Sequence, residues 1–302
     1  MQHTDAEALD CAIVGAGPGG LTAAIYLARY RRTSIAIDAG NSRARWIPES
    51  HNCPGFPSGI SGDEFLARLA EHAAVAGARV DTGEATAVRR LSTGEFELEW
   101  TKGRLRARKL IIATGCEDIL PSVDGLDEAV ACGAIRFCPV CDAYETIDRD
   151  IAVHGPLEAA AGHALFMRTY SSRVTVVPTT DDPPDAGTIR DLHEAGVAIT
   201  SAPRGLRFDG KRCAFEIAGS LRAFDVLYPT LGSRQRSGLA RSLGAACDDE
   251  GALLVDGHQM TSVEGVYAIG DVVSALNQIS VATGHAAVAA TAVHNALPKR
   301  FA

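Results

Sequence analysis

The sequence lacks the features that mark several large classes of protein. It contains no run of about 18 uncharged apolar residues, so we expect no segment that spans a membrane. Lysine and arginine number 29 against 37 acidic residues, and the formal net charge of −8 argues against nucleic acid or an anionic membrane as a partner. The first ten residues, MQHTDAEALD, hold no basic region followed by an apolar one, so we expect no secretory signal. We therefore expect an ordinary globular protein of the cytoplasm, whose 302 residues are enough for roughly two domains.

Cysteine is present without forming a disulfide framework. Of the eight cysteines, six are scattered singly through predicted strands, helices and loops, which suits a reducing cytosol. The other two, Cys138 and Cys141, form a Cys-x-x-Cys pair in the stretch Arg-Phe-Cys-Pro-Val-Cys-Asp. A zinc site would need a second Cys or His pair at ligand spacing, and none accompanies this one. We therefore predict no metal site and assign the pair to redox chemistry.

The pair Cys138 and Cys141 is the feature around which the rest of the sequence is organised. Two thiols at this spacing can close a tight disulfide and reopen it, and the flanking geometry can lower a thiol pKa well below its free value of about 8.5. Two merely structural thiols are the alternative. Most of the remaining sequence makes sense as apparatus that moves two electrons to or from this pair.

A glycine-rich turn near the N-terminus predicts a dinucleotide site. The strand-like residues 10–15 lead into Gly15-Ala-Gly17-Pro-Gly-Gly20 and then into the apolar helical pattern LTAAIYLARY. Gly15 makes the tight turn, Gly17 lets the backbone approach a pyrophosphate, and Gly20 lets helix and strand pack closely. The helix N-terminus supplies amide donors and partial positive charge to the phosphates. An ordinary glycine-rich turn is the alternative, but the next strand, 33–37, ends at Asp38, where a carboxylate suits a ribose 2′-hydroxyl.

Two later strands also end in residues that suit a ligand. One apolar strand stops at a Thr-Gly turn, where glycine indicates close backbone approach, and another ends in Gly-Asp, whose carboxylate can accept hydrogen bonds from a ribitol chain. An Asn-Gln-Ile stretch and a long alanine-rich helix, 281–296, then close the chain. The residues singled out in this part of the sequence are Thr114, Gly115, Gly270, Asp271, Gln278, Ile279 and, within the helix, His285.

Periodicity predicts the elements between these motifs. Residues 63–76 form an amphipathic helix capped by Ser61 or Asp63. The stretches 79–90, 95–101 and 104–110 alternate in part between apolar and polar residues, as a small meander does, and a separate strand starts at Leu110. The other expected elements are a rigid loop at 51–57, a linker at 121–125, a helix at 188–195, a strand-to-glycine turn at 231–232 and a short strand with a turn at 253–263.

A second strand–turn–helix unit follows the cysteine pair, but its turn is altered. The strand 150–154 is followed by Gly155-Pro-Leu157-Glu-Ala-Ala160 and a helix, 161–170. Leu157 replaces the middle glycine, and we expect its side chain to stand where a pyrophosphate must approach the backbone. The next strand, 173–177, runs into Pro-Thr-Thr-Asp-Asp-Pro-Pro, which offers no carboxylate at the strand end for a ribose and no Arg or Lys for a 2′-phosphate.

Taken in order, these motifs resemble the low-molecular-weight thioredoxin reductase family. The resemblance covers nearly the whole chain, and it includes Asn52-Cys-Pro-Gly-Phe-Pro, which on physical grounds alone is only a loop. It implies an α/β fold of two Rossmann-like three-layer dinucleotide-binding domains, the second inserted in the first. The FAD-binding domain would comprise residues 1–117 and 246–302, and the inserted NAD(P)-binding-like domain, with the cysteine pair, residues 118–245. It also implies a homodimer.

The resemblance further implies roles for single residues. Cys141 would face the flavin as the charge-transfer thiolate, and Cys138 would exchange with the substrate. Asp142 would act as general acid and base for the thiols; a helix N-cap is the alternative. His285 stands where typical members carry an acid, so it is either a proton relay or a packing residue. FAD would be held by Gly15, Gly17, Gly20, Asp38, Asn52, Thr114, Gly115, Gly270, Asp271, Gln278 and Ile279.

The altered second turn leaves several functions open. Members that use NADPH carry G-x-G-x-x-A and a His-Arg-Arg cluster, both of which are missing here. We therefore expect an FAD-dependent thiol–disulfide oxidoreductase that does not use NADPH and acts on a thioredoxin-like protein or a small disulfide or dithiol. A reduced flavin or a small redox protein would be its electron donor. The alternatives are a dithiol oxidase that passes electrons to oxygen, a thioredoxin reductase with a degenerate NADPH site, and a non-enzymatic flavin redox sensor.

Overall fold

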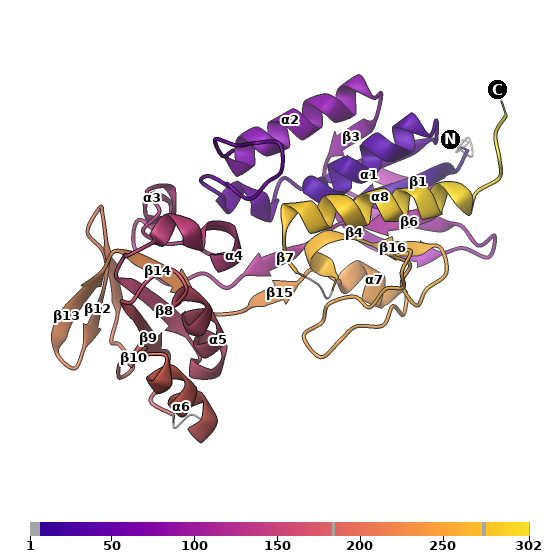
Figure 1. Ribbon diagram of the computed structural model, residues 1–302. Helices are drawn as coiled ribbons and strands as arrows, with labels where there is room; N and C mark the ends of the chain where they lie inside the picture. The colour runs from indigo at the N-terminus through magenta and orange to yellow at the C-terminus, as the bar shows by residue number, and fades with distance from the viewer. Residues whose placement is uncertain (1–6, 183–184, 274–275, 302) are drawn as a thin grey trace. The chain divides into compact units, whose positions relative to one another are not determined.

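The computed structural model describes residues 7–182, 185–273 and 276–301, which form two compact units (Figure 1). The first unit comprises Met1–Ile47, Ser61–Glu117 and Arg234–Ala302, and the second comprises Pro48–Ile60 and Asp118–Ser233. The second unit is thus inserted in the first. Among the described helices, none is both long enough and apolar enough to cross a membrane.

The first unit is built on a seven-stranded sheet with the order β3-β2-β1-β6-β5-β4, and β16 pairs with β6 beside this path. Strands β1, β2, β3, β6 and β16 run parallel, whereas β4 and β5 add an antiparallel meander to the N-terminal part of β6. The strands are β1 (Leu9–Val14), β2 (Ser34–Asp38), β3 (Arg79–Thr82), β4 (Ala85–Arg90), β5 (Phe96–Trp100), β6 (Gly103–Ile112) and β16 (Val266–Ala268).

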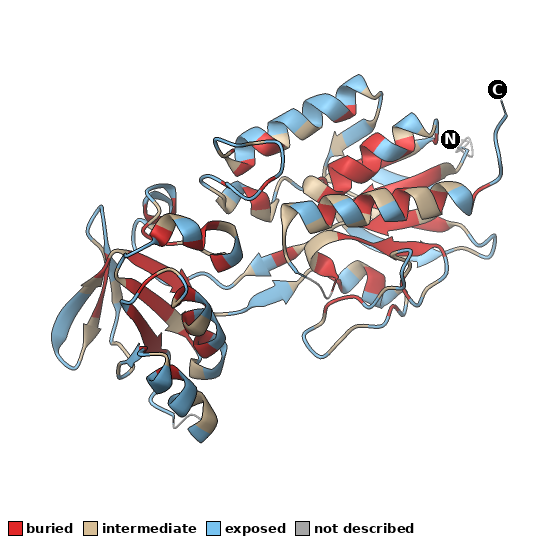
Figure 2. Ribbon diagram, viewed as in Figure 1, coloured by how far each residue is buried: buried red, intermediate tan, exposed pale blue. Residues whose placement is uncertain are grey.

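Alternating side chains of the first sheet form two apolar layers. Along β1, Cys11 and Ile13 face the helices α1 and α8, while Ala12 and Val14 face the opposite layer with Phe96. Figure 2 shows the buried residues concentrated on the sheet and on the inward sides of α1 and α8. The helices of this unit are α1 (Pro18–Arg29), η1 (Arg43–Trp46), α2 (Gly62–Val75), α7 (Gly238–Ser242), η3 (Gly270–Val272) and α8 (Ile279–Asn295).

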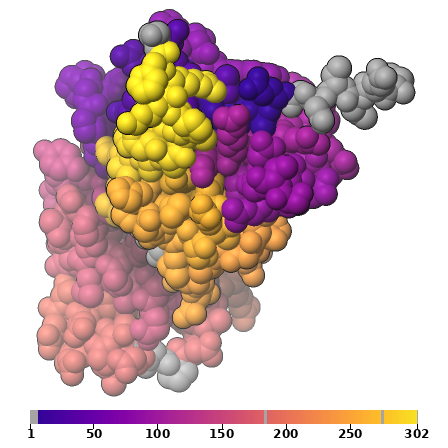
Figure 3. Space-filling model, turned by 90° about the vertical axis from the view of Figure 1, so that its right-hand side faces the viewer, coloured from indigo at the N-terminus to yellow at the C-terminus, as the bar shows by residue number. Residues whose placement is uncertain are grey.

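The C-terminal segment is fastened to the first unit by one buried arginine. Arg32 is 6% exposed and donates to the carbonyl oxygens of His294, at 2.9 Å, and Pro298, at 3.0 Å. Figure 3 shows this segment, in yellow, at the surface beside N-terminal residues in indigo. Apolar residues such as Ile25 and Val293 pack α1 and α8 into the same core, and Arg32 adds a polar contact at the end of α8.

The second unit repeats the parallel arrangement on a smaller scale. Its four-stranded parallel sheet has the order β10-β9-β8-β14, and a three-stranded antiparallel sheet, β11-β12-β13, is attached to it. Its core lies between the parallel sheet and α5 and includes Ile151, Val153, Ala164 and Tyr228. The strands are β8 (Ile151–Gly155), β9 (Val174–Pro178), β10 (Ala198–Ile199), β11 (Leu206–Phe208), β12 (Cys213–Ile217), β13 (Ser220–Phe224) and β14 (Val226–Pro229).

Short helices complete the second unit, and the chain enters and leaves it through paired strands. The helices are α3 (Leu126–Ala131), α4 (Pro139–Asp142), η2 (Ala143–Thr146), α5 (Leu157–Met167) and α6 (Ala186–Glu194). The entering segment β7 (Cys116–Asp118) pairs with the leaving segment β15 (Ser233–Gln235) as a two-stranded sheet.

The α/β class and the two Rossmann-like units confirm the predicted fold, but several local predictions differ from the structure. Residues 79–90 are two strands, and the first of them extends the parallel sheet rather than the meander. Residues 103–112 form one long strand instead of two. Residues 253–263 make only isolated bridges, and α3, α4 and α7 were not expected. The predicted proline-rich stretch after β9 includes residues 183–184, which lie outside the described residues.

The borders of the units also differ from the expected ones. Residues 234–245 belong to the first unit because α7 buries Ala240 in the layer beneath the first sheet. The loop 48–60 groups with the second unit although it lies within the first part of the chain. An antiparallel β-bridge between Ser50 and Ile60 brings the two ends of this loop together.

Candidate active site

The cysteine pair forms a closed disulfide at the start of a short helix. The sulfur atoms of Cys138 and Cys141 are bonded, and the Cα atoms lie 5.2 Å apart. Cys138 is the N-cap of α4 and has an extended backbone conformation. Pro139 occupies the first helical position, where its fixed φ is suitable and the helix needs no amide donor. The amide of Cys141 donates to the carbonyl of Cys138 at 2.9 Å and closes the turn. The predicted disulfide is therefore confirmed.

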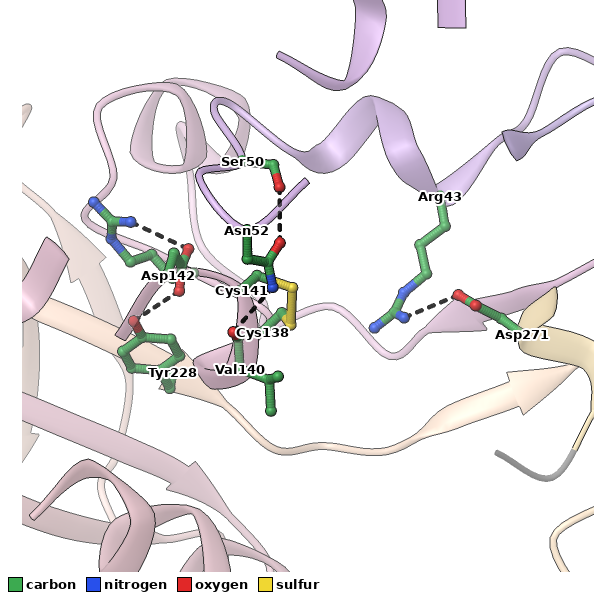
Figure 4. Close-up of a disulfide and its surroundings, with 10 residues drawn as sticks. Arg43, Ser50, Asn52, Cys138, Val140, Cys141, Asp142, Tyr228 and Asp271 are labelled. Carbon is green, nitrogen blue, oxygen red and sulfur yellow. Dashed lines mark hydrogen bonds and ion pairs between the residues drawn. A yellow bond between two sulfur atoms is a disulfide. The ribbon is translucent and has the colours of Figure 1, made fainter. Parts of the chain in front are cut away.

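Asp142 is buried directly behind this disulfide turn. It is 8% exposed; its Oδ1 accepts from the Tyr228 hydroxyl at 2.8 Å, and its Oδ2 pairs with Nη1 of Arg136 at 3.1 Å. Figure 4 shows the carboxylate on the Tyr228 side of the turn. Burial raises the pKa of Asp142, and Arg136 and Tyr228 oppose that rise. Asp142 also occupies the N-cap position of η2, which was the alternative role, but its side chain makes no capping hydrogen bond there.

Asn52 contacts the disulfide turn within the second unit. Its Nδ2 donates to the carbonyl of Val140, between the two cysteines, at 3.1 Å, and its Oδ1 accepts from the Ser50 hydroxyl at 3.0 Å (Figure 4). The prediction for Asn52 was a cofactor contact. The structure gives it a place in the support of the cysteine pair, which no periodicity or spacing in the sequence indicated.

The glycine-rich turn of the first unit has the geometry of a phosphate cradle. Gly15 has φ +99°, and a Cβ there would lie 2.3 Å from the carbonyl oxygen of Ala113. A Cβ on Gly20 would lie 1.9 Å from the carbonyl oxygen of Gly15. A Cβ on Gly17 would meet only the Ser42 side chain, at 3.1 Å, so this position is open to an approaching group. The three glycines therefore fit the dinucleotide role predicted for them.

Other predicted cofactor residues lie at the carboxyl ends of strands in the same unit. Asp38 ends β2, and its Oδ1 accepts from the amide of Gly40 at 2.9 Å. The Thr114 hydroxyl donates to the carbonyl of Arg236 at 2.6 Å, and the amide of Arg236 donates to the carbonyl of Gly115 at 3.0 Å. Gly115 has φ +68°, and a Cβ there would meet no atom within 4 Å. The carboxyl ends of parallel strands are where ligands of such folds bind.

A polar cluster lies at the end of β16 and the beginning of α8. Nη1 of Arg43 pairs with Oδ2 of Asp271 at 3.1 Å, and the two side chains are 25% and 20% exposed (Figure 4). Cys116 lies with its sulfur 4.0 Å from the same carboxylate oxygen. Of the other residues predicted for this part of the chain, Gly270 has φ +72°, Gln278 is the N-cap of α8, and Ile279 is its first residue.

His285 is a histidine of α8 whose ring is only partly accessible. Its Nδ1 is buried and has no hydrogen-bond partner among the described residues. Burial lowers the pKa of His285, and the charge of Asp271 opposes that change. A buried ring nitrogen without a partner costs free energy unless a ligand or water satisfies it. This orphaned nitrogen, together with the open cradle at Gly17, fits a polar cofactor bound in the first unit.

The turn of the second unit differs from this cradle in its length, in the position of its proline and in its charge. Pro156 is the N-cap of α5 and Leu157 its first residue, whereas α1 begins at Pro18, with Gly17 as N-cap. Pro156 has no amide to offer a phosphate. Leu157, which was expected to stand in the path of a pyrophosphate, packs partly against the core of its own unit.

An acidic side chain lies at the altered turn. Glu158 lies in the first turn of α5, whereas the first turn of α1 contains no acid. Its carboxylate accepts from the amide of Asp185 at 3.0 Å and from the Thr188 hydroxyl at 2.7 Å. Glu158 also places negative charge at the start of α5, where a phosphate would need partial positive charge. Thus the two units have the same kind of turn but differ in the charge at the start of the helix that follows it.

Several of these side chains were not found from the sequence. Arg43 and Arg236 are arginines in predicted loops, and Tyr228 lies 86 positions from its partner Asp142. Only Arg136 belongs to a stretch that the sequence singled out. No group of three or more His, Cys, Asp or Glu side chains among the described residues is arranged to hold a metal ion.

Comparisons with known proteins agree with this geometry. The family model described as pyridine nucleotide-disulphide oxidoreductase matches residues 9–286. The thioredoxin reductase of Treponema pallidum (strain Nichols) is 28% identical over 296 residues, which cover 94% of this chain and 95% of that protein. The crystal structure of HlmI is similar with a TM-score of 0.87 and 28% identity, covering 98% of this chain and 93% of that one. The thioredoxin reductase from Streptococcus pyogenes MGAS5005 has a TM-score of 0.85 and 27% identity, covering 95% and 97% of the two chains.

Proposed function

The chain belongs to the pyridine nucleotide-disulphide oxidoreductase family, and we propose that it exchanges electrons between FAD and the Cys138–Cys141 disulfide without NADPH as donor. The class of enzyme, an FAD-dependent disulfide oxidoreductase of the thioredoxin reductase type, follows from the family and its relatives. One observation carries the finer proposal: the cysteine pair is a closed disulfide in a unit whose own nucleotide turn carries Pro156 and Glu158.

FAD is assigned to the first unit. When bound, it would supply a centre that accepts or gives two electrons. The turn Gly15–Gly20 would hold its phosphates, because the amides before α1 are free of side-chain obstruction at Gly17. Asp38 would accept from the ribose, and Asp271 would accept from the ribitol chain while Arg43 fixes its orientation. The same assignment covers Thr114, Gly115, Gly270, Gln278 and Ile279. For Asn52, the contact with Val140 favours support of the disulfide instead.

The thiol chemistry is assigned to the disulfide turn. Cys138 is the proposed exchange thiol and Cys141 the proposed flavin-facing thiol, as the family resemblance implies. In thiol–disulfide exchange, the sulfur that attacks and the sulfur that leaves are both thiolates. A nearby group that can take up and return a proton therefore assists the reaction in both directions. Asp142 is that group: it is buried behind the turn and is held by two donors. His285 is proposed as a proton relay in the first unit on the basis of its orphaned Nδ1.

The substrate is proposed to be a thioredoxin-like protein or a small disulfide or dithiol, and the protein is proposed to act as a homodimer. In the reducing direction, a reduced flavin or a small redox protein would be the donor. A second candidate is a dithiol oxidase that passes electrons to oxygen. The altered turn favours it specifically, because a dithiol substrate can reduce Cys138–Cys141 directly and needs no nicotinamide site.

Anaerobic reduction by a small dithiol tests the proposed electron path. Dithiothreitol is mixed with the yellow protein, and the flavin absorbance is followed. We expect bleaching in the native protein and its loss in Cys138→Ser and Cys141→Ser, since either change removes the disulfide. Cys132→Ser is the matched control, because Cys132 is an exposed free thiol of the same unit. Equal bleaching in all four proteins would contradict the path through the disulfide.

Re-aeration of the reduced protein distinguishes the two candidates. Sustained oxygen uptake with excess dithiol, at a rate comparable to bleaching, would favour the oxidase. Slow re-oxidation together with rapid reduction of an added disulfide would favour the reductase. A flavin that is reduced by dithionite but turns over neither dithiol nor disulfide would leave a redox sensor and contradict the proposed enzyme function.

A further inference from the structure

The carboxylate of Asp142 is held by donors from two other segments of the second unit. Tyr228 belongs to β14 and bonds to Oδ1, and Arg136 precedes α4 and pairs with Oδ2. Each oxygen of the carboxylate therefore has its own donor. A geometry of this kind orients the carboxyl plane as well as holding its charge.

Both donors are held in place by contacts that do not involve Asp142. Tyr228 is fully buried in the sheet, where it pairs with Val153 of β8. Nε of Arg136 donates to the carbonyl of Gly133 at 3.1 Å, and its backbone amide donates to the carbonyl of Leu227 at 3.0 Å. Asp142 therefore does not have to order the side chains of Tyr228 and Arg136. Whether the contact forms depends on the position of α4, which carries Asp142.

The charges that face Asp142 have opposing effects. Burial favours the neutral acid and raises the pKa of Asp142; the Arg136 charge and the Tyr228 hydroxyl favour the carboxylate; and the charge of Glu145 favours the acid. Reduction of Cys138 and Cys141 would add thiolate charge on the same turn, which again favours a protonated Asp142. The proton affinity of Asp142 is thus lower with the disulfide closed than with it open.

We propose that Arg136 and Tyr228 are positioning residues that keep Asp142 ionised while the disulfide is closed, so that Asp142 stores the proton of thiol exchange. In one exchange, the proton of an incoming thiol passes to Asp142 and the thiol sulfur bonds to one cysteine sulfur. The Cys138–Cys141 bond breaks, and the proton passes to the cysteine sulfur that leaves. Atoms and electrons balance without a further reactant. This inference rests on the proposed exchange function.

The test is the pH dependence of disulfide reduction in Tyr228→Phe and Arg136→Gln. The rate of reduction by dithiothreitol is measured by thiol alkylation and mass, a readout that does not depend on the flavin. Both variants lose a group that favours the carboxylate, so the pKa of Asp142 rises further. The rate should then begin to fall at a pH about 1 unit higher than in the native protein. Arg136→Lys retains the charge and should restore most of the native profile.

Two controls separate positioning from mere stability. Tyr144→Phe removes a hydroxyl from a side chain of η2 that is 72% exposed, and its profile should match the native one. Asp142→Asn should abolish the acid limb. Native profiles in both Tyr228→Phe and Arg136→Gln, or a uniform drop in rate at every pH, would overturn the inference while leaving the exchange function intact. A native disulfide that no dithiol reduces would overturn the proposed function and this inference with it.

Discussion

The turns of the two strand–turn–helix units, residues 15–20 and 155–160, share only their first glycine, and the differences bear on how each turn could hold a dinucleotide. In the first unit, Gly15 turns with positive φ, Gly17 leaves the approach open, and no acid lies in the first turn of the helix. In the second, Pro156 removes an amide and Glu158 places a carboxylate at the helix N-terminus. Phosphate binding at a helix start depends on donors, space and charge together. Each turn contains one proline without an amide, Pro18 or Pro156, so the clear difference is the negative charge of Glu158.

The difference in turn length has a structural cause. Helix α1 begins three residues after Gly15, whereas α5 begins two residues after Gly155. The shorter turn allows Leu157 to reach the core of its unit, and Ala160 is fully buried where the first unit has Gly20. The second unit thus keeps the fold and uses its turn for packing. A Rossmann-like fold alone does not establish nucleotide binding.

The largest expected effect is that of Gly20→Val. A Cβ at this position would lie 1.9 Å from the carbonyl oxygen of Gly15, so the helix must move from the strand. We expect a loss of about 3 kcal/mol or more in the free energy of unfolding and protein without flavin. The matched change in the second unit, Ala160→Gly, should cost only about 1 kcal/mol and leave the flavin bound. Denaturant unfolding and the flavin-to-protein absorbance ratio measure both; full flavin content in Gly20→Val would contradict the cradle.

Gly17→Leu places the residue of the second turn in the first. A Cβ at this position would meet only Ser42, so we expect the fold to hold. The added side chain would block the approach of the pyrophosphate, and we expect FAD affinity to fall about 100-fold through lost charge-assisted hydrogen bonds. Titration of the apoprotein with FAD measures this affinity. Gly19→Ala is not a suitable control, because its Cβ would lie 3.3 Å from the carbonyl oxygen of Ala282. Gly284→Ala, where a Cβ meets no atom within 4 Å, is the control.

Leu157→Gly tests whether the missing glycine alone explains the second turn. Pro156 and Glu158 remain in this variant, so we expect no reduction of the flavin by micromolar NADPH. The lost packing and the added backbone freedom should lower the free energy of unfolding by about 1–2 kcal/mol. Rapid bleaching of the variant by NADPH would show that the side chain of Leu157 is the whole obstacle.

The smallest expected effect, on the pH dependence of stability, comes from the residue that precedes the first glycine of each turn. Val14 precedes Gly15, whereas His154 precedes Gly155 and donates from Nδ1 to the carbonyl of Val177 at 2.7 Å. Burial lowers the pKa of His154 below its ordinary value of 6.5, so the unfolded chain takes up a proton first as the pH falls. Stability should therefore decrease below about pH 6.5, and His154→Val should weaken that decrease by a few degrees in Tm at most. Melting curves from pH 5 to pH 8 measure it; an unchanged slope would contradict the assignment.

The main architecture could be predicted because its signals are local. The turn Gly15–Gly20 lies between a strand and a helix of the correct periodicity, and Cys138 and Cys141 are three positions apart. Their consequences, a parallel sheet and a closed disulfide, were found as expected. The altered turn at Leu157 was also visible, but its side chain packs inward, because helix length and direction are set by the whole unit.

The missed features depend on contacts between distant segments. Tyr228 reaches Asp142 because its neighbour Leu227 pairs with Ile135, just before the cysteine turn, and nothing near either residue in the sequence indicates that pairing. The loop with Asn52 joins the second unit through contacts such as that with Val140, whereas its position in the sequence favoured the first. Single arginines such as Arg43 carry no pattern, so only the folded chain identifies the carboxylate that each one pairs with.

The most direct measurement compares NADPH with dithiothreitol as reductant of the native protein under anaerobic conditions. The flavin absorbance is followed by rapid mixing, with NADPH at micromolar concentration and the dithiol in excess. The turn of the second unit, with Pro156 and the carboxylate of Glu158, should bind NADPH poorly. The Cys138–Cys141 disulfide should accept electrons from the dithiol. We therefore expect rapid bleaching by dithiothreitol and none by NADPH. Rapid bleaching by micromolar NADPH would show that the second unit still holds a dinucleotide and would contradict the account.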